Sequence, residues 1–430
     1  MTTVIYWFRS DCRVHDHPGL QAALRDATRL LPVFVDDPRQ QQPDRWGFAP
    51  RGRHRQVFLA DTLADLDASL RRLGNGLEIV TGTPETVLPA LARACGASRI
   101  VCEDIPCPQE QDAVRAIRAA GITVQTIWHA TLIAPPQLPF AVADLPGVFT
   151  RFRVRIEEAG VLPLQPLPEP VSLPPRPAAC PVPDVPPRLA RPEPAHDPRS
   201  AFPYAEPAWQ GGEQAALRHL HAYFSDDRAP TYKATRNGLT GTSYSSKWSP
   251  WLATGALSPR RVFAALRDHE AEAGVSDGSY WLWFELLWRD YFRFLHARHG
   301  SRLYRVEGLG QLPPPRHDAR RFADWCAGRS GQAFVDAGMR DLAATGFLSN
   351  RMRQMVASWL IHDVPGDWRA GAAWFESQLM DYDPCSNQGN WLYLAGRGTD
   401  PRGVRRFCPR RQAEQYDPDG AYRRVWSARA

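Results

Sequence analysis

The sequence has almost no lysine and no long hydrophobic run. Only Lys233 and Lys247 are lysines among the 52 basic residues, so arginine carries nearly all of the positive charge behind the net value of +6. That charge permits a polyanionic partner without requiring one, because binding depends on where the charge lies. No apolar run approaches the ~18 residues of a membrane-spanning helix, and charged residues interrupt the first apolar run, which does not suit a secretory signal peptide. We therefore expect a cytoplasmic protein without membrane contact.

The sequence also lacks any paired cysteine motif. Its eight cysteines are scattered without a C-x-x-C pair, and the closest two, Cys102 and Cys107, are separated by four residues. A structural metal site needs four ligands at suitable spacing, so the sequence predicts no metal site and reduced, mostly buried thiols. Tryptophan, by contrast, is abundant, with 15 residues. Large aromatic side chains fill cores, and they also line sites for ring-shaped ligands and stack on bases.

The first 130 residues alternate short apolar runs with amphipathic stretches such as residues 57–73, whose apolar positions have helical spacing. This alternation predicts a parallel α/β sheet that is covered on both faces. No G-x-G-x-x-G or Walker-type loop follows the first apolar run, so we assign no phosphate loop there. The predicted strands are residues 4–8, 30–35, 77–80, 99–102 and 122–127.

Proline and helical periodicity organise the rest of the chain. Thirteen of the 40 prolines fall between residues 161 and 194, a density that favours an extended connector and excludes a helix or a central strand. After Gly211 the apolar spacing is helical throughout, in segments 213–224, 259–273, 281–299, 349–363 and 370–380. The sequence thus predicts an α/β domain at residues 1–130, a proline-rich interdomain linker at 131–210 and an all-helical domain at 211–430.

Several segments of the helical half carry polar groups suited to binding, although each is ambiguous alone. Residues 232–261 gather hydroxyls and a lysine before a helix start at Ser258; such clusters bind phosphate well, yet a Ser/Thr/Gly-rich segment is more often only a loop. Glu285 and Arg289 lie four residues apart on one helical face, which is also what a buried ion pair would require. Asp381 and Asp383 have the spacing of metal-binding acids, but no histidine accompanies them.

Together these segments are more specific. The order and spacing of TSYSSKWSPWLATGALSP, WFELLWRDYFRF, VDAGMRDLAATGFLSNRMRQ, DWRAGAAWFESQL and DYDPCSNQGNWLYLAGRGTDPR resemble the flavin-binding domain of cryptochromes and photolyases. WFRSDCRVHDHPGL resembles the start of the same family's Rossmann-like antenna domain, and the resemblance runs from about residue 4 to residue 426. YSSKWSPWLA, ELLWRDYFRF, CSNQGNW and QAEQYDPDG resemble the DASH branch in particular.

The resemblance implies an FAD cofactor inside the helical domain. The positions that hold its phosphates and ribose are Tyr232, Ser245, Ser246, Lys247, Trp248 and Ser249, and hydroxyls with an ammonium are good partners for a pyrophosphate. The positions around the isoalloxazine and adenine are Arg289, Asn350, Asp381, Asp383 and Asn387, with Arg353 pairing with Asp381. Trp248 stands where a smaller aliphatic residue is usual. Asn387 can hydrogen-bond a protonated or an anionic flavin through the orientation of its amide, and in this family an asparagine here favours the reduced anionic form.

On the substrate side, the resemblance implies light-driven repair of cyclobutane pyrimidine dimers in DNA. Glu285 would hydrogen-bond the damaged pair and Trp288 would stack on it, with Glu285, Trp288 and Asn387 as the catalytic set. The full substrate set is Glu285, Trp288, Asn350, Arg351, Gln354 and Tyr393. Gln354 and Tyr393 stand where duplex-repairing enzymes have Met and Trp, which weakens the apolar stacking that offsets unpairing of bases, so we expect single-stranded substrates. The alternative is a blue-light photoreceptor or regulator that binds FAD and nucleic acid without significant repair. In either case we expect a monomer.

Two further expectations concern light harvesting and electron supply. Glu110 matches the acidic residue that holds an antenna 5,10-methenyltetrahydrofolate, with a deazaflavin or no antenna as alternatives. Trp391 and Trp368 match the proximal and middle members of the family's tryptophan relay, but Pro315 stands at the surface position. Because proline has no accessible oxidised state, we expect slow photoreduction unless another aromatic residue provides a bypass.

Overall fold

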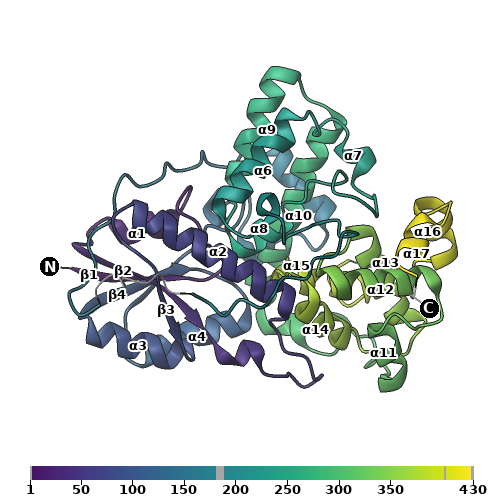
Figure 1. Cartoon of the computed structure of the whole chain (residues 1–430), viewed down its shortest axis with the longest axis horizontal. Coiled ribbons are helices and arrows are strands. Elements are labelled where there is room, and N and C mark those ends of the chain that lie inside the picture. Colours follow the sequence, from purple (N-terminus) through teal and green to yellow (C-terminus); the bar gives the residue numbers. More distant parts are fainter. Residues whose placement is uncertain (1, 181–187, 401–402, 428–430) are drawn as a thin grey trace.

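The computed structural model describes residues 2–180, 188–400 and 403–427, and it consists of an α/β part and a larger helical part (Figure 1). The α/β part is built on a five-stranded parallel sheet in the order β3-β2-β1-β4-β5. All five predicted strands are confirmed, with shifts of a few residues at their ends. The strands are β1 (Thr3–Phe8), β2 (Arg29–Asp36), β3 (Glu78–Thr81), β4 (Ala97–Glu103) and β5 (Val124–Ile127).

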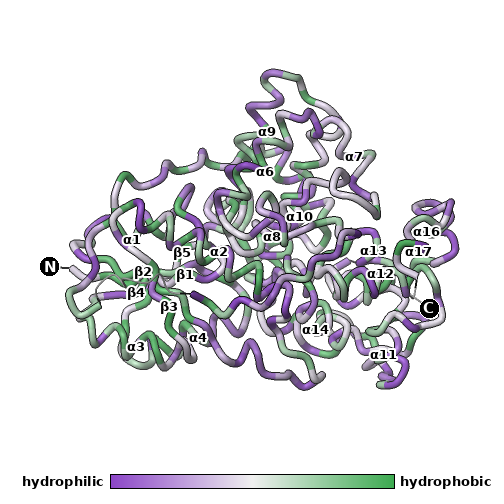
Figure 2. The backbone as a smooth tube through the Cα atoms, in the orientation of Figure 1, coloured by the Kyte–Doolittle hydropathy of each residue, from purple (hydrophilic) through white to green (hydrophobic). Residues whose placement is uncertain are grey.

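Helices cover both faces of this sheet, as the continuous apolar strands require. The central strand β1 is buried along its whole length, and its alternate side chains enter two different cores. Val4, Tyr6 and Phe8 pack in the core that α2 shares, whereas Ile5 and Trp7 pack in the core that α3 and α4 share. The four covering helices are α1 (Pro18–Leu24), α2 (Arg53–Arg72), α3 (Pro84–Ala94) and α4 (Pro108–Ala119). Figure 2 shows the hydrophobic strands gathered between them.

The segment that we predicted as a linker, residues 131–210, contains more structure than its proline content indicates. Its described residues after 160 form no helix or strand up to the short turn η4 (Pro207–Trp209). Before them come the turns η2 (Pro135–Gln137) and η3 (Val142–Asp144) and a helix, α5 (Phe149–Glu158), whose apolar face is buried in the core of the helical part. Phe149, Phe152 and Ile156 have the spacing of one helical face, and this spacing could have predicted α5 within a segment that we assigned as a linker from its prolines.

The helical part is arranged around α10 (Asp277–His299), which packs against α5, α7, α9 and α15. The predicted helices are confirmed, and the last of them begins earlier than predicted because Asp367 caps the amide of Arg369. The remaining elements are α6 (Glu213–Ser225), α7 (Tyr232–Thr235), α8 (Ser249–Thr254), α9 (Pro259–Ala273), η5 (Gly300–Tyr304), α11 (Ala319–Cys326), α12 (Ala333–Thr345), α13 (Asn350–His362), α14 (Trp368–Gln378), α15 (Pro384–Leu394), α16 (Pro409–Tyr416) and α17 (Ala421–Val425). Within the described ranges, no helix combines the length and apolarity needed to cross a membrane.

A buried polar contact joins the two parts beside the start of α9. Ser258 and Arg260 both bind the carboxylate of Asp16, which is fully buried. Gly255 lies against the backbone of Ser10 with a φ of +70°, and a Cβ there would stand 2.0 Å from the Ser10 carbonyl oxygen, so only glycine fits. The α/β part is therefore held in a fixed position against the loop that leads from α8 into α9.

Candidate functional site

The hydroxyl-rich segment before α8 holds a buried cation without a partner. Lys247 is 2% exposed, and its Nζ makes no hydrogen bond among the described residues. It lies 3.1 Å from the centroid of the Tyr244 ring, and burial lowers the pKa of Lys247 well below its usual value. Ser245 and Lys247 have positive φ angles of 59° and 61°, a strained conformation that is typical of binding segments. A buried ammonium of this kind requires an anion, and the phosphates of FAD fit that requirement.

The next residues tie this segment to two other elements. Ser249 donates a 2.6 Å hydrogen bond to Asp381, and Arg353 of α13 donates to both oxygens of the same carboxylate at 2.9 and 2.7 Å. The predicted pairing of Arg353 with Asp381 is therefore present, through one guanidinium nitrogen that both carboxylate oxygens share. Three elements that are distant in sequence meet at Asp381.

Asp383 has a structural role that the sequence analysis did not identify. One carboxylate oxygen caps α15 by accepting from the amide of Ser386 at 2.7 Å, and the other accepts from Arg293 at 2.9 Å. Burial alone would raise the pKa of Asp383. The charges of Arg293 and Arg289 and the hydrogen bond from Ser386 outweigh this effect and lower the pKa to about 2. Arg293 lies one turn after Arg289 on α10, so helical spacing could have indicated it.

Asn387, one turn into α15, has a fixed amide. Its Nδ2 donates to the carbonyl of Ala372 in α14 at 3.1 Å. The amide oxygen is then the atom that remains to accept a hydrogen bond from a ligand. The orientation of this amide is thus set by the packing of α14 on α15.

The other residues predicted around the flavin have varied surroundings. Arg289 donates to the carbonyls of Ala130 and Leu252, the latter at 3.2 Å, and burial lowers its pKa to about 10. Asn350 is exposed at the start of α13. The remaining predicted residues lie around α6, α7 and α8. Tyr232 is buried, and the carbonyl of Ser246 accepts a hydrogen bond from His219 at 3.0 Å. The ring of Trp248 packs on Tyr223 and Phe224, with centroid distances of 4.9 and 5.9 Å.

The residues predicted to contact DNA form a second group on α10, α13 and α15. Glu285 is 29% exposed and forms an ion pair with Arg236. Trp288 stacks on Phe149 with a centroid distance of 3.9 Å and an angle of 13°, and it meets Tyr393 edge-on at 6.0 Å. Arg236 and Phe149 were not predicted from the sequence, because each lies in a segment that is distant in sequence from α10, which it contacts.

Arg351 and Gln354 form the other edge of this group. Arg351 donates to the Gln354 amide oxygen at 3.2 Å and to Asn237 at 3.1 Å, and its guanidinium lies 4.7 Å from the Tyr416 ring centroid. Arg405 lies at the same distance from the centroid of the Tyr393 ring. The substrate side thus presents several cations beside aromatic rings, which suits nucleic acid.

The two predicted relay tryptophans, Trp391 and Trp368, are both buried. α14 approaches Trp391 so closely that a Cβ on Gly371 would stand 2.3 Å from its ring. Pro315 lies in the segment between η5 and α11, and His317, two residues later, packs its ring on Trp46 with a centroid distance of 5.2 Å. His317 also accepts a hydrogen bond from the amide of Asp367, the residue before Trp368. Trp46, from the α/β part, is therefore a tryptophan near the vacant relay position that the sequence analysis did not consider.

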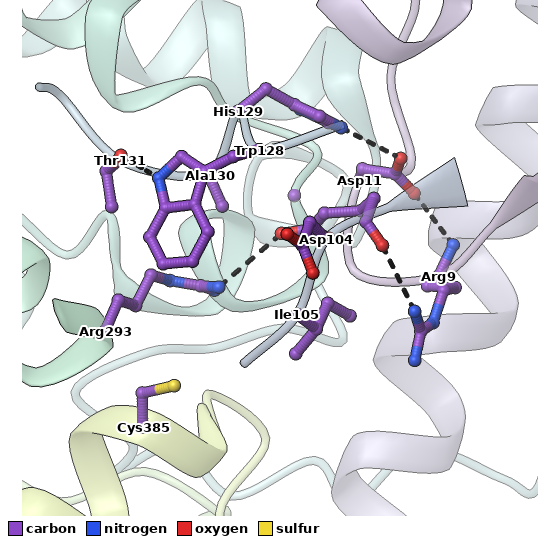
Figure 3. Close-up of polar contacts among 12 residues, drawn as sticks. Arg9, Asp11, Asp104, Ile105, Trp128, His129, Ala130, Thr131, Arg293 and Cys385 are labelled. Carbon is purple, nitrogen blue, oxygen red and sulfur yellow. Dashed lines mark hydrogen bonds and ion pairs between the residues drawn. The ribbon is translucent and has the colours of Figure 1, made fainter. Parts of the chain in front are cut away.

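Glu110, the predicted antenna residue, lies in the first turn of α4 and is 40% exposed. It pairs with Arg9, whose guanidinium lies 4.4 Å from the centroid of the Trp7 ring. Figure 3 shows Arg9 beside the buried Asp11, close to the junction of the two parts of the molecule.

Comparison with known proteins identifies both parts of the chain. Residues 4–171 match the family model for DNA photolyase, and residues 281–429 match that for the FAD binding domain of DNA photolyase. The chain is 42% identical to a cryptochrome DASH from Synechocystis sp., over 99% of this chain and 87% of that protein, and 41% identical to a cryptochrome DASH from Xenopus laevis, over 98% and 82%.

Solved structures agree with these matches. A crystal structure of a Synechocystis cryptochrome, 42% identical, superposes with a TM-score of 0.93 over 99% of this chain and 88% of that one. A bacterial class III photolyase from Agrobacterium tumefaciens, 28% identical, superposes with a TM-score of 0.79 over 99% and 86%. Together with the buried, unpaired Lys247, these matches show that the chain belongs to the photolyase/cryptochrome family, alongside the cryptochrome DASH proteins, and that FAD is its cofactor.

Proposed function

We propose that this protein repairs cyclobutane pyrimidine dimers in single-stranded DNA under blue light. The observation that supports this most directly is the edge-on contact of Trp288 on α10 with Tyr393 on α15, with the acid Glu285 one turn before Trp288 on α10. Bound FAD supplies the absorption of light and the transfer of an electron. The residues of the chain then hold the cofactor, hold the damaged bases and exclude water.

On the cofactor side, we assign charge neutralisation to Lys247 and hydrogen bonding to the hydroxyls near it, Ser245 and Ser246. Asp381 is held by Ser249 and Arg353, and Asp383 by Arg293, so both carboxylates are fixed in position before any ligand arrives. Asn387 offers its amide oxygen to the cofactor. Preorganised groups of this kind bind without a further cost in reorganisation.

On the substrate side, Glu285 is the hydrogen-bond acceptor for the damaged pyrimidine pair. The ion pair with Arg236 restricts the position of its carboxylate. Phe149 covers one face of Trp288, so the opposite face is the one on which a base would stack. This arrangement places an acceptor and a stacking surface one turn apart on α10.

The preference for single strands follows from the environment of Tyr393. Arg405 lies over its ring and Trp288 meets it edge-on, so its faces offer little apolar surface to an incoming base. Removing a dimer from a duplex costs pairing and stacking free energy, which stacking on the protein must offset. A dimer in a single strand requires no such compensation.

The test uses reduced, FAD-loaded protein that is illuminated with dimer-containing oligonucleotides, single-stranded and duplex, and measures restored thymines. We expect faster repair of the single strand and no repair by Glu285→Ala, with FAD content unchanged. Glu272→Ala, an exposed acid on α9, is the matched control and should repair normally. Binding of DNA without repair by the wild type would instead indicate a photoreceptor or regulator.

We also propose that Glu110 and Arg9 belong to a binding site for a folate antenna. Extraction of the pigments of the purified protein, followed by mass spectrometry, tests this assignment, and Glu110→Gln should lose the folate but keep FAD. Glu85→Gln on α3, which removes another acid paired with an arginine, is the control. The cytoplasmic location and the monomeric state stay predictions.

A further inference from the structure

Two cysteines and a histidine that are far apart in the sequence meet in the buried junction of the two parts. The donor atoms of Cys107, His296 and Cys385 all lie within 4.8 Å of one another, and all three residues are buried. The two sulfur atoms are 3.4 Å apart, although their residues are separated by 278 positions. Cys107 caps α4, His296 lies in the last turn of α10, and Cys385 is the second residue of α15, so the group joins three elements.

The histidine is oriented as a ligand would be. His296 is 1% exposed, and its Nδ1 lies 2.8 Å from the carbonyl of Phe292 one turn earlier. Because a carbonyl only accepts, Nδ1 carries a proton, and Nε2 is the nitrogen available to a metal ion. Nε2 makes no hydrogen bond of ordinary geometry within the described part of the chain. A backbone contact that fixes the tautomer and leaves the other nitrogen free is typical of metal-ligating histidines.

The charges around the group suit a bound cation. The Cys107 sulfur lies 3.4 Å from the Cys385 sulfur, with His296 beside both and the Arg293 side chain close by. Arg293 is itself balanced by Asp383 at 2.9 Å and Glu103 at 3.5 Å. Figure 3 shows Cys385 beside Arg293, with its sulfur directed toward the segment that carries Ile105. Two thiolates and a neutral imidazole would carry two negative charges, which a divalent cation neutralises in place.

We propose that Cys107, His296 and Cys385 bind one Zn²⁺ ion that joins the α/β part to α10 and α15. Sulfur and imidazole donors without a carboxylate select a borderline-soft cation over Mg²⁺ or Ca²⁺. Tetrahedral Zn–S bonds of about 2.3 Å require the sulfurs to be about 3.8 Å apart, so the pair has to open only slightly. Binding replaces the thiol protons, which pass to solvent, and no electron is transferred.

Tyr304 is the fourth residue of this site. Its ring meets that of His296 edge-on with a centroid distance of 5.8 Å, and its hydroxyl is buried without a hydrogen-bond partner among the described residues. The hydroxyl, or a water molecule that it holds, completes the tetrahedron. The ion would then brace the first turn of α15, since Cys385 lies midway between Asp383 and Asn387. This inference is independent of the proposed repair activity.

The test measures zinc in FAD-loaded protein purified without a metal-affinity tag. We expect about one zinc per chain, with an X-ray absorption spectrum that fits two sulfurs at about 2.3 Å and lighter ligands at about 2.0–2.1 Å. Cys107→Ser should lower the zinc content to below about a tenth of that in the wild type, with FAD content and circular dichroism as checks on folding. Cys102→Ser removes another buried thiol five residues earlier, in β4, and should keep the zinc.

A second measurement on the wild type avoids dependence on a variant that fails to fold. After chelation and reduction, Co²⁺ is added to the FAD-loaded protein, and the difference spectrum should show thiolate charge-transfer bands that saturate at one equivalent. Protein that takes up neither metal under reducing conditions would overturn the proposal. So would a native disulfide between Cys107 and Cys385 found by peptide mapping, or equal loss of zinc from Cys102→Ser.

Discussion

Replacing Lys247 by methionine should have opposite effects on the flavin-free protein and on FAD binding. Without ligand, Lys247 is a buried ammonium that contacts the Tyr244 ring but has no hydrogen-bond partner among the described residues, and a buried polar group without a hydrogen bond costs about 1–3 kcal/mol. Methionine has a similar length and no charge, so Lys247→Met should raise the free energy of unfolding of the flavin-free protein by that amount. It should also weaken FAD binding, because a hydrogen bond to a charged group contributes about 1.5–3 kcal/mol, or roughly 10- to 150-fold in Kd.

The pH dependence provides an independent check. Burial lowers the pKa of Lys247 in the folded, flavin-free protein, so between that lowered value and the usual value near 10.5 the unfolded chain binds more protons. The stability of the flavin-free protein should therefore increase with pH across this window, and Lys247→Met should remove that slope. A bound pyrophosphate favours the charged lysine, so FAD binding in the same window should take up a proton and weaken as the pH rises.

The assays are denaturant unfolding of flavin-free protein and titration of FAD followed by flavin fluorescence. The other lysine of the chain is the control: Lys233 is half exposed and pairs with Asp277, which is 84% exposed, so Lys233→Met should change both quantities little. If Lys247→Met leaves the Kd of FAD unchanged, the assignment of this residue to the phosphates is wrong. If Lys247→Met instead destabilises the flavin-free protein, the ammonium makes a stabilising contact in the folded state that outweighs the cost of its burial.

Three further predictions concern other parts of the site. Asp383→Ala should lose most of the FAD and destabilise the fold by about 3–5 kcal/mol, because it leaves Arg293 buried with one partner fewer. Flavin absorbance and urea unfolding measure these two effects, and a normal flavin content would refute the assignment of Asp383. The lowered pKa of Asp383, about 2, should stabilise the fold by about 2 kcal/mol at neutral pH. This contribution is complete above about pH 4 and is lost as the pH falls through 2, so Asp383→Asn should flatten that part of the acid unfolding curve. Blue-light reduction of the flavin by external thiol should be slow in the wild type, faster in Pro315→Trp and absent in Trp391→Phe. If the wild type is instead reduced rapidly and Trp46→Phe abolishes this reduction, Trp46 replaces the missing relay member.

The sequence was sufficient for features that are encoded locally. The five strands were predictable because each is a continuous apolar run in a parallel sheet, and α9 because its apolar spacing and its Ser258-Pro259 start mark its first turn. The ion pair of Arg353 with Asp381 was expected from the family resemblance. Pairs formed by the fold itself were not accessible: Arg236 and Glu285 are 49 residues apart, and Cys107 and Cys385 are 278 apart. No local pattern records such contacts, since they depend on how helices pack.

The proline-rich segment bears on the order in which the molecule assembles. Its residues lie along the sheet: Leu173 donates its amide to the carbonyl of Leu73 at 2.8 Å, and the carbonyl of Pro175 accepts from the amide of Leu30 at 3.1 Å. Asn75 adds a side-chain bond to Pro174 at 2.7 Å. All of these partners precede residue 181, so the ribosome has made the sheet and the extended segment that crosses it before it makes the helices from α6 onward. The nascent chain can thus close this half of the molecule first, and the helices are then synthesised against a surface that is already in place.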